Sequence, residues 1–273
     1  MQAIQQNRTQ SNIRDNHERA DFEFPFLDPV YSAAETSNHL IVSNSFHFRI
    51  GGRRFTIPKF LHLGERGGGA PYEIGIFAGI NPGEESTSHA AANLLIDLEW
   101  IPDVARNYVL FNYPVVNPRA YSNRREDAPN LNELFWQRSA EPEVSFIEKE
   151  FQRHAFNGFI TYQLDADSNG FYASTPSRVI AGEVLRKAVN AAALAIPLDA
   201  NPIRILEVSR SGRVAGQPKG RMSAPRTAHS SPFEVTLHAG ASVAPEAQTA
   251  GFVIATKMIL REYRKFISHA QNL

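Results

Sequence analysis

The stretch EIGIFAGINPGEESTSHAAANLLIDL, residues 73–98, decides the fold. It opens with an apolar run at residues 74–80 that is bounded by turn residues, as in a strand buried in a mixed or parallel sheet. Residues 81–83 break the run. Glu84 and Glu85 then precede an alanine- and leucine-rich segment, which places acidic side chains at the positive amino-terminal end of a helix. Open α/β sheets bind ligands at the carboxyl ends of their strands, so we expect a site at this turn.

Composition narrows the class of protein. The 273 residues, 42% of them hydrophobic, are enough for one sizeable domain. We expect a flexible polar tail over residues 1–20 and a single α/β domain over residues 21–273. The formal net charge is zero, with 28 basic and 28 acidic residues, which argues against nucleic acid and anionic membrane surfaces as partners.

Cysteine usage and apolar run lengths add two further expectations. The chain has no cysteine, so disulfides, thiolate zinc sites and cysteine nucleophiles are excluded. No stretch has the apolar length of a signal peptide or a membrane span, and the expected location is therefore the cytoplasm.

Further strands and helices alternate along the chain, which predicts an α/β layered fold. An aromatic stretch that proline interrupts twice, residues 22–29, predicts an irregular segment instead. Strands are predicted at residues 46–50, 55–57, 108–116, 159–164 and 233–237, and helices from residue 142, over residues 179–195 and from residue 245.

Four segments resemble, in their order and spacing, the zinc carboxypeptidase family, and more loosely the aspartoacylases and succinylglutamate desuccinylases. The segments are GINPGE at residues 79–84, NPRAYSNRREDAPNLNELFW at residues 117–136, LDADSNGFY at residues 164–172 and FEVTLH at residues 233–238. This resemblance implies a three-layer α/β fold whose central sheet is mixed, mostly parallel and flanked by helices. It also implies a cleft at the strand ends.

The resemblance places the metal ligands of the family at Asn81, Glu84 and Asp165. The family motif G-x-H-x-x-E keeps its glutamate as Glu84, whereas Asn81 replaces the histidine, and Asp165 stands where the family has its second zinc histidine. Such a trio offers oxygen only. Oxygen ligands suit calcium, magnesium or manganese better than zinc.

The resemblance also assigns the residues that would meet a substrate. His238 stands where the family carries its general-base glutamate, and Arg125 corresponds to the arginine that polarises the scissile carbonyl. Asn132 and Glu133 stand where an asparagine and an arginine grip the carboxylate of the substrate. Because Glu133 reverses the charge of that arginine, it favours a cationic or hydrogen-bond-donating ligand group.

These replacements predict a non-catalytic protein without a cofactor, which binds a small peptide, an amide-containing ligand or a protein partner in the cleft. The alternative is a divalent-metal-dependent peptidase or amidohydrolase that cleaves a small peptide or an N-acyl amide. Glu84 and Asp165 would bind its metal. The family resemblance implies zinc, whereas the oxygen ligands favour magnesium, calcium or manganese. His238 would serve as general base, and Arg125 would stabilise the oxyanion. A third interpretation is an assembly protein that docks through the arginine-rich residues 204–226.

Simpler interpretations of the same residues stay open. Residues 81–83 can form an ordinary tight turn, with Glu84 as a favourable charge at a helix start. Asp165 can belong to a plain turn, Arg125 to a solvated charge cluster, and His238 can be a hydrogen-bonded interior histidine.

Overall fold

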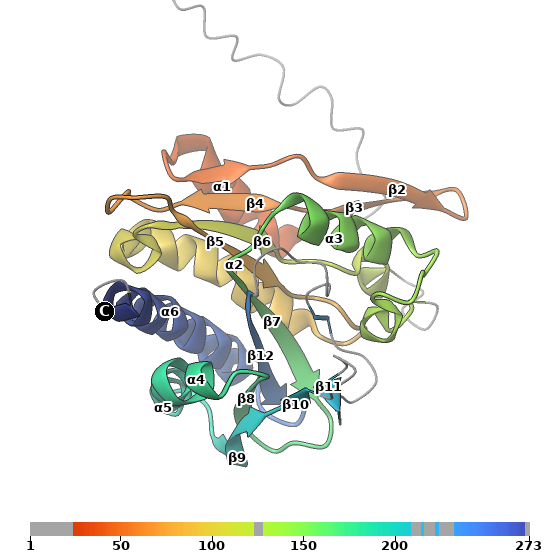
Figure 1. Cartoon of the computed structure of the whole chain (residues 1–273). Coiled ribbons are helices and arrows are strands. Elements are labelled where there is room, and N and C mark those ends of the chain that lie inside the picture. The colour runs from red at the N-terminus through yellow and green to blue at the C-terminus, as the bar shows by residue number, and fades with distance from the viewer. Residues whose placement is uncertain (1–23, 123–127, 209–213, 216–221, 224–231, 271–273) are drawn as a thin grey trace, which may run out of the picture.

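The computed structural model describes residues 24–122, 128–208, 214–215, 222–223 and 232–270. At its centre lies a sheet of eight strands in the order β1-β4-β6-β5-β7-β12-β8-β9 (Figure 1). Its strands are β1 (Leu40–Val42), β4 (Phe60–Leu63), β5 (Tyr72–Phe77), β6 (Tyr108–Tyr113), β7 (Gly158–Asp165), β8 (Phe171–Thr175), β9 (Leu198–Ile205) and β12 (Phe233–Gly240). Four neighbouring pairs are parallel and three are antiparallel, which confirms the predicted mixed, mostly parallel sheet.

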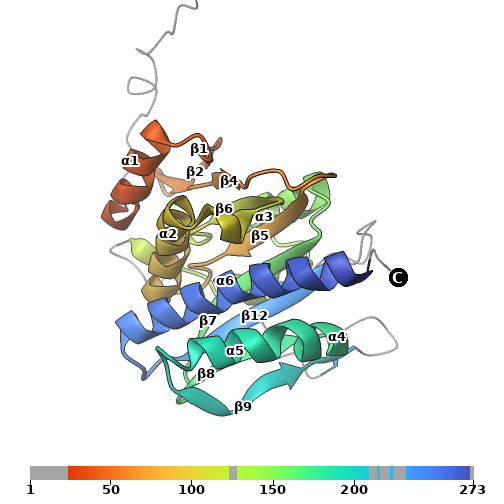
Figure 2. The same cartoon turned by 90° about the vertical axis from the view of Figure 1, so that its left-hand side faces the viewer.

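Helices cover both faces of the sheet, so the described chain has three layers. Figure 2 shows α1, α2, α5 and α6 on one side of the sheet, with α3 on the other. The helices are α1 (Asp28–Thr36), α2 (Glu85–Trp100), α3 (Pro142–Arg153), α4 (Arg178–Ile180), α5 (Arg186–Ala192) and α6 (Pro245–Ala270). Two apolar clusters fill the spaces between the layers. One joins the sheet to α2, α5 and α6, and the other joins it to α3.

Short elements complete the chain. Strands β2 (Phe46–Ile50) and β3 (Arg53–Ile57), both predicted, form an antiparallel hairpin, and β10 (Glu207–Val208) pairs with β11 (Val214–Ala215). A π-helical turn, η6 (Ala181–Leu185), continues α4 into α5. The 3-10 turns are η1 (Pro25–Leu27), η2 (Pro102–Ala105), η3 (Pro118–Tyr121) and η5 (Leu131–Leu134).

The junction between β5 and α2 forms as its sequence predicts. Ile74 and Ile76 are fully buried, and the chain leaves the sheet at Gly79, whose φ is +59°. A Cβ on Gly79 would lie 2.3 Å from the hydroxyl oxygen of Ser88, so only glycine fits this position. The hydroxyl of Thr87 accepts a hydrogen bond from the Gly79 amide at 2.9 Å, which fastens the turn to the first turn of α2.

Two details differ from the sequence-based predictions. The predicted irregular segment is wrong for residues 25–29, which form η1 and the start of α1, because Pro29 is well placed in the first turn of a helix. Strand β9 was not predicted, since its Asn-Pro pair is typical of a turn and its place at the sheet edge tolerates proline. The predicted tail at residues 1–20 lies outside the described residues, as does most of the arginine-rich segment at residues 204–226.

None of the helices in the described ranges combines the length and the apolar character needed to cross a bilayer.

Candidate functional site

The candidate site lies where three neighbouring parallel strands end. Strands β5, β7 and β12 are adjacent in the sheet and run in the same direction, so their carboxyl ends share one edge. Asn81 and Glu84 follow β5, Asp165 ends β7, and His238 lies near the end of β12. The fold therefore gathers these four predicted site residues at one edge of the sheet.

Glu84 is fixed by donors from two segments. Its Oε2 accepts the Asn81 backbone N–H at 3.1 Å, and its Oε1 accepts the Asn81 side-chain amide at 3.0 Å. The backbone N–H of Leu164, at the end of β7, also donates to Oε1 at 3.1 Å. We call Asn81, Glu84 and Leu164 the turn cluster. In it, one carboxylate joins the β5–α2 turn to the end of β7.

Burial dominates the electrostatics of the turn cluster. Glu84 is only 4% exposed, and this desolvation raises the pKa of its carboxyl to about 7, although the hydrogen bonds from Asn81 and Leu164 oppose the shift. The side-chain oxygen of Asn81, Oδ1, is buried without a hydrogen-bond partner among the residues that the structure describes, because its amide nitrogen turns toward Glu84. The cluster thus holds a carboxyl that exchanges its proton near neutral pH.

Asp165 belongs to a different group of side chains. The hydroxyl of Tyr172 donates to its Oδ2 at 2.7 Å, and the backbone N–H of Asp167 donates to its Oδ1 at 3.0 Å. The Arg204 guanidinium lies 4.0 Å from the same Oδ2 and 3.5 Å from the centre of the Tyr172 ring. Its Oδ2 is therefore engaged by side chains of β8 and β9, and its Oδ1 by the backbone of the turn that follows β7.

His238 completes this second group. Its imidazole stacks on the Tyr172 ring at a centroid distance of 4.3 Å and an interplanar angle of 8°. The two residues are direct partners in the antiparallel pairing of β12 with β8, which explains why their rings meet. The Nε2 atom of His238 lies 3.1 Å from the hydroxyl of Ser174. We call Asp165, Tyr172, Arg204 and His238 the stacked cluster.

The three predicted metal ligands, Asn81, Glu84 and Asp165, are not arranged to hold a zinc ion. Both oxygens of Glu84 accept hydrogen bonds from the protein, Asn81 directs its nitrogen toward that carboxylate, and Asp165 is directed toward Tyr172. A metal held by all three side chains would require the Asn81 amide to turn away from Glu84 and Asp165 to turn away from Tyr172. Within the described ranges, no group of three or more His, Cys, Asp or Glu side chains could hold a metal ion.

Two of the predicted substrate-binding residues, Asn132 and Glu133, lie in η5 and not in the two clusters. Asn132, in η5, is 5% exposed, and its Oδ1 is buried and has no hydrogen-bond partner in the described part of the chain. Glu133 is exposed and lies 3.4 Å from the side-chain nitrogen of Asn130. Arg125 lies outside the described residues.

Sequence reasoning missed two buried polar residues on β7. Thr161 and Gln163 pair in register with Thr236 and His238, so all four side chains point to the same face of the sheet. Thr161 Oγ1 and Gln163 Nε2 are buried, and neither has a hydrogen-bond partner within the described ranges. The signal was present, because polar residues alternate at positions 161, 163 and 165 of an otherwise apolar strand.

Comparisons with known proteins give the class of fold. No family model matches the sequence, and no curated protein matches it. Among solved structures, the chain is similar to a metallo-carboxypeptidase from Burkholderia cenocepacia, with a TM-score of 0.62 and 14% identity over 87% of this chain and 68% of that one.

Two further solved structures agree. Bovine thrombin-activatable fibrinolysis inhibitor, in complex with tick carboxypeptidase inhibitor, gives a TM-score of 0.61 and 12% identity over 88% of this chain and 97% of that one. A metallo-carboxypeptidase from Pseudomonas aeruginosa, in complex with (2-guanidinoethylmercapto)succinic acid, gives a TM-score of 0.54 and 15% identity. The match covers 85% of this chain and 66% of that one. The fold is carboxypeptidase-like, as the sequence resemblance implied.

Proposed function

We propose that this chain uses a carboxypeptidase-like scaffold to bind a small peptide or amide-containing ligand without hydrolysing it. The observation that carries the proposal is the state of Glu84. In the turn cluster, both of its carboxylate oxygens are occupied by protein donors, where the family resemblance places a metal ligand. A carboxylate that stabilises its own turn by hydrogen bonds has a structural role, and we give it no part in hydrolysis.

The unpartnered polar atoms of the site support a ligand with amide groups. Asn81 Oδ1 and Asn132 Oδ1 are acceptors without donors, and Gln163 Nε2 is a donor without an acceptor, among the described residues. Buried polar atoms that lack partners cost free energy, which a ligand with complementary groups relieves. Peptide groups carry both an N–H donor and a carbonyl acceptor. Exposed Glu133 favours a ligand that also carries a cationic or donor group.

The proposal is tested by asking whether peptides are retained intact. The purified chain is incubated with a pool of synthetic tripeptides, half with a free carboxyl terminus and half amidated, and bound peptides are recovered by gel filtration and identified by mass spectrometry. We expect retention of intact peptides, and weaker retention by Gln163→Leu, which removes the free donor. Absence of any retained peptide would overturn the ligand class. Catalytic accumulation of cleaved products would overturn the non-hydrolytic role.

A divalent-metal-dependent peptidase or amidohydrolase is the second candidate. It is favoured by the raised pKa of the buried Glu84 carboxyl, because groups with perturbed pKa values gather at functional sites. It would require Glu84 and Asp165 to leave their present partners. It predicts turnover that depends on an added divalent ion and disappears in His238→Ala, whereas equal turnover in that variant would eliminate it.

A further inference from the structure

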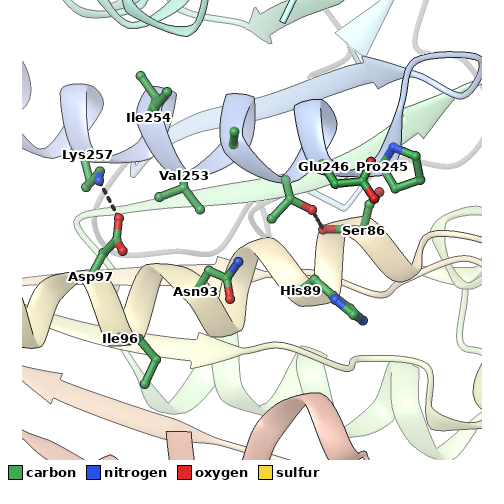
Figure 3. A pocket seen from close by; sticks show the side chains of 12 residues that line it. Ser86, His89, Asn93, Ile96, Asp97, Pro245, Glu246, Val253, Ile254 and Lys257 are labelled. Carbon is green, nitrogen blue, oxygen red and sulfur yellow. Dashed lines mark hydrogen bonds and ion pairs between the residues drawn. The ribbon is translucent and has the colours of Figure 1, made fainter. Parts of the chain in front are cut away.

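Two neighbouring helices form a surface that lies outside the strand-end site. Helices α2 and α6 lie on the same face of the sheet (Figure 2). They run side by side in the same direction, because Ser86 bonds to Gln248 near their amino-terminal ends and Asp97 pairs with Lys257 further along. The groove between them has a volume of about 600 Å³ and is open to solvent (Figure 3). The outer surface of the helix pair is therefore hollowed at one end.

The same two helix faces continue beyond the groove. Trp100 stands three residues after Asp97, and Arg261 stands four residues after Lys257, so both lie about one turn past the groove and at a similar level. We give the name helical seam to the partly or fully exposed residues of these faces, which are Ile96 and Trp100 of α2 and Glu246, Ala250, Ile254, Lys257 and Arg261 of α6.

Trp100 is the most exposed member of the helical seam for which burial would be favourable. It is 80% exposed, and the large apolar surface of an indole gains free energy when it leaves water. Ile96 and Ile254 of the seam are also partly exposed. Tryptophan is enriched among the residues that dominate the energy of protein interfaces. An exposed tryptophan beside an open groove on one surface therefore indicates contact with another protein molecule.

The charges of the helical seam are separated by sign. Glu246 lies at one end and Arg261 at the other, about 22 Å apart along the axis of α6, and both are exposed. Neither forms an ion pair with another residue in the described part of the chain. Between them, Lys257 is neutralised by Asp97 at 2.5 Å. A surface with an acid at one end and a base at the other is complementary to a second copy of itself that is turned by half a rotation.

One two-fold axis satisfies both the charges and the tryptophan. If the axis passes through the middle of the seam near Val253, Arg261 of each copy meets Glu246 of the other. Because Trp100 lies level with Arg261, the same rotation brings it to the end of the other groove that Pro245 lines. We propose that the chain forms a two-fold dimer through the helical seam, with Trp100 of each copy inserted in the groove of the other.

The dimer is tested by sedimentation velocity on a dilution series of the full chain. We expect a reversible equilibrium of monomer and dimer at micromolar concentrations. Trp100→Ala is expected to raise the dissociation constant by roughly 30-fold or more, as for a residue at the centre of an interface. Leu194→Ala is the matched control and should leave the constant unchanged, because Leu194 is 89% exposed but lies outside the helical seam.

A charge exchange tests the two-fold arrangement. Glu246→Arg and Arg261→Glu each place like charges opposite one another, and each is expected to weaken the dimer by roughly tenfold. The double variant restores opposite charges and is expected to recover association. Circular dichroism checks that every variant is folded.

Three outcomes would overturn the proposal. The first is a wild-type chain that sediments as a monomer throughout the micromolar range. The second is a dimer that Trp100→Ala weakens no more than Leu194→Ala does. The third is a double charge variant that associates no better than the two single variants, because Glu246 and Arg261 would then not meet across the interface.

Discussion

The turn cluster and the stacked cluster lie at the same edge of the sheet but differ in burial and in the groups that bind their carboxylates. The turn cluster saturates one buried carboxylate with amide donors from its own turn and from β7. The stacked cluster uses side chains from four strands, and its Arg204 side chain is 39% exposed. The two carboxylates that the resemblance aligns with metal ligands therefore belong to separate hydrogen-bonded groups. Four measurements test this distinction between the clusters.

The largest expected effect is that of removing the carboxylate of the turn cluster. Glu84→Ala leaves three donors without an acceptor in a buried setting, and we expect the free energy of unfolding to fall by about 3 kcal/mol in urea titrations. Asp165→Ala is the matched control. Because Asp165 is only half-buried, its loss is expected to cost about 1 kcal/mol. Equal losses for the two variants would show that the clusters do not differ as described.

The second effect is a pH dependence of the free energy of unfolding, which arises from Glu84 in the turn cluster. The pKa of Glu84 is raised to about 7 in the folded chain from an ordinary value of 4.5, so the folded state holds this proton more tightly than the unfolded state. Its contribution to stability is complete below pH 4.5 and is lost as the pH rises through 7. Glu84→Gln cannot lose a proton. Between these pH values the variant should therefore gain roughly 2–3 kcal/mol relative to the wild type.

Urea titrations of both chains at pH values from 4.5 to 8 measure this difference. Other titrating groups, such as Glu143 and His154, are common to both chains and cancel in the comparison. Parallel stability profiles would contradict a raised pKa at Glu84.

The third effect separates the hydrogen bond of Tyr172 from its ring. Tyr172→Phe removes the bond to Asp165 and should cost about 1 kcal/mol, while the stack with His238 remains. Tyr172→Leu removes both. In NMR spectra, the ring-current shift of the His238 imidazole protons should persist in the Phe variant and vanish in the Leu variant. A shift that is unchanged in the Leu variant would mean that the two rings do not stack.

The smallest effect concerns the cation over the Tyr172 ring. Arg204→Lys keeps the charge but loses the planar group that lies 3.5 Å from the ring centre, and we expect a loss of about 0.5 kcal/mol in urea titrations. Arg186→Lys, at an exposed position on α5, is the control and should leave stability unchanged. Equal losses of stability in the two variants would show that the cation–π contact does not stabilise the stacked cluster.

The parts of the fold that depend on local sequence were predictable. The apolar run of β5, the Asn-Pro-Gly turn and the alanine-rich α2 are encoded within 26 consecutive residues, and the structure confirms all three. Strand β9 was not predictable from the same signals, because it contains an Asn-Pro pair and gains its hydrogen bonds only by pairing with β8.

The site was predictable only in part. Position along the strands placed Asn81, Glu84, Asp165 and His238 at one edge, as the sequence implied. The direction of each side chain depends on partners from other strands. Asp165 meets Tyr172, seven residues further along the chain, because β8 lies beside β12 and brings the Tyr172 ring to the end of β7. The donors that saturate Glu84 likewise include Leu164, which is 80 residues away in the chain.

The central claim is that the carboxylate of Glu84 joins the β5–α2 turn to the end of β7 by hydrogen bonds and does not bind a metal. The most direct test is the zinc content of the purified wild-type chain after incubation with excess zinc and removal of the free ion, measured by inductively coupled plasma mass spectrometry. The double variant with Glu84→Ala and Asp165→Ala is measured in parallel. We predict no stoichiometric zinc in either protein. One zinc ion per wild-type chain that is lost in the double variant would contradict the claim and favour the hydrolase.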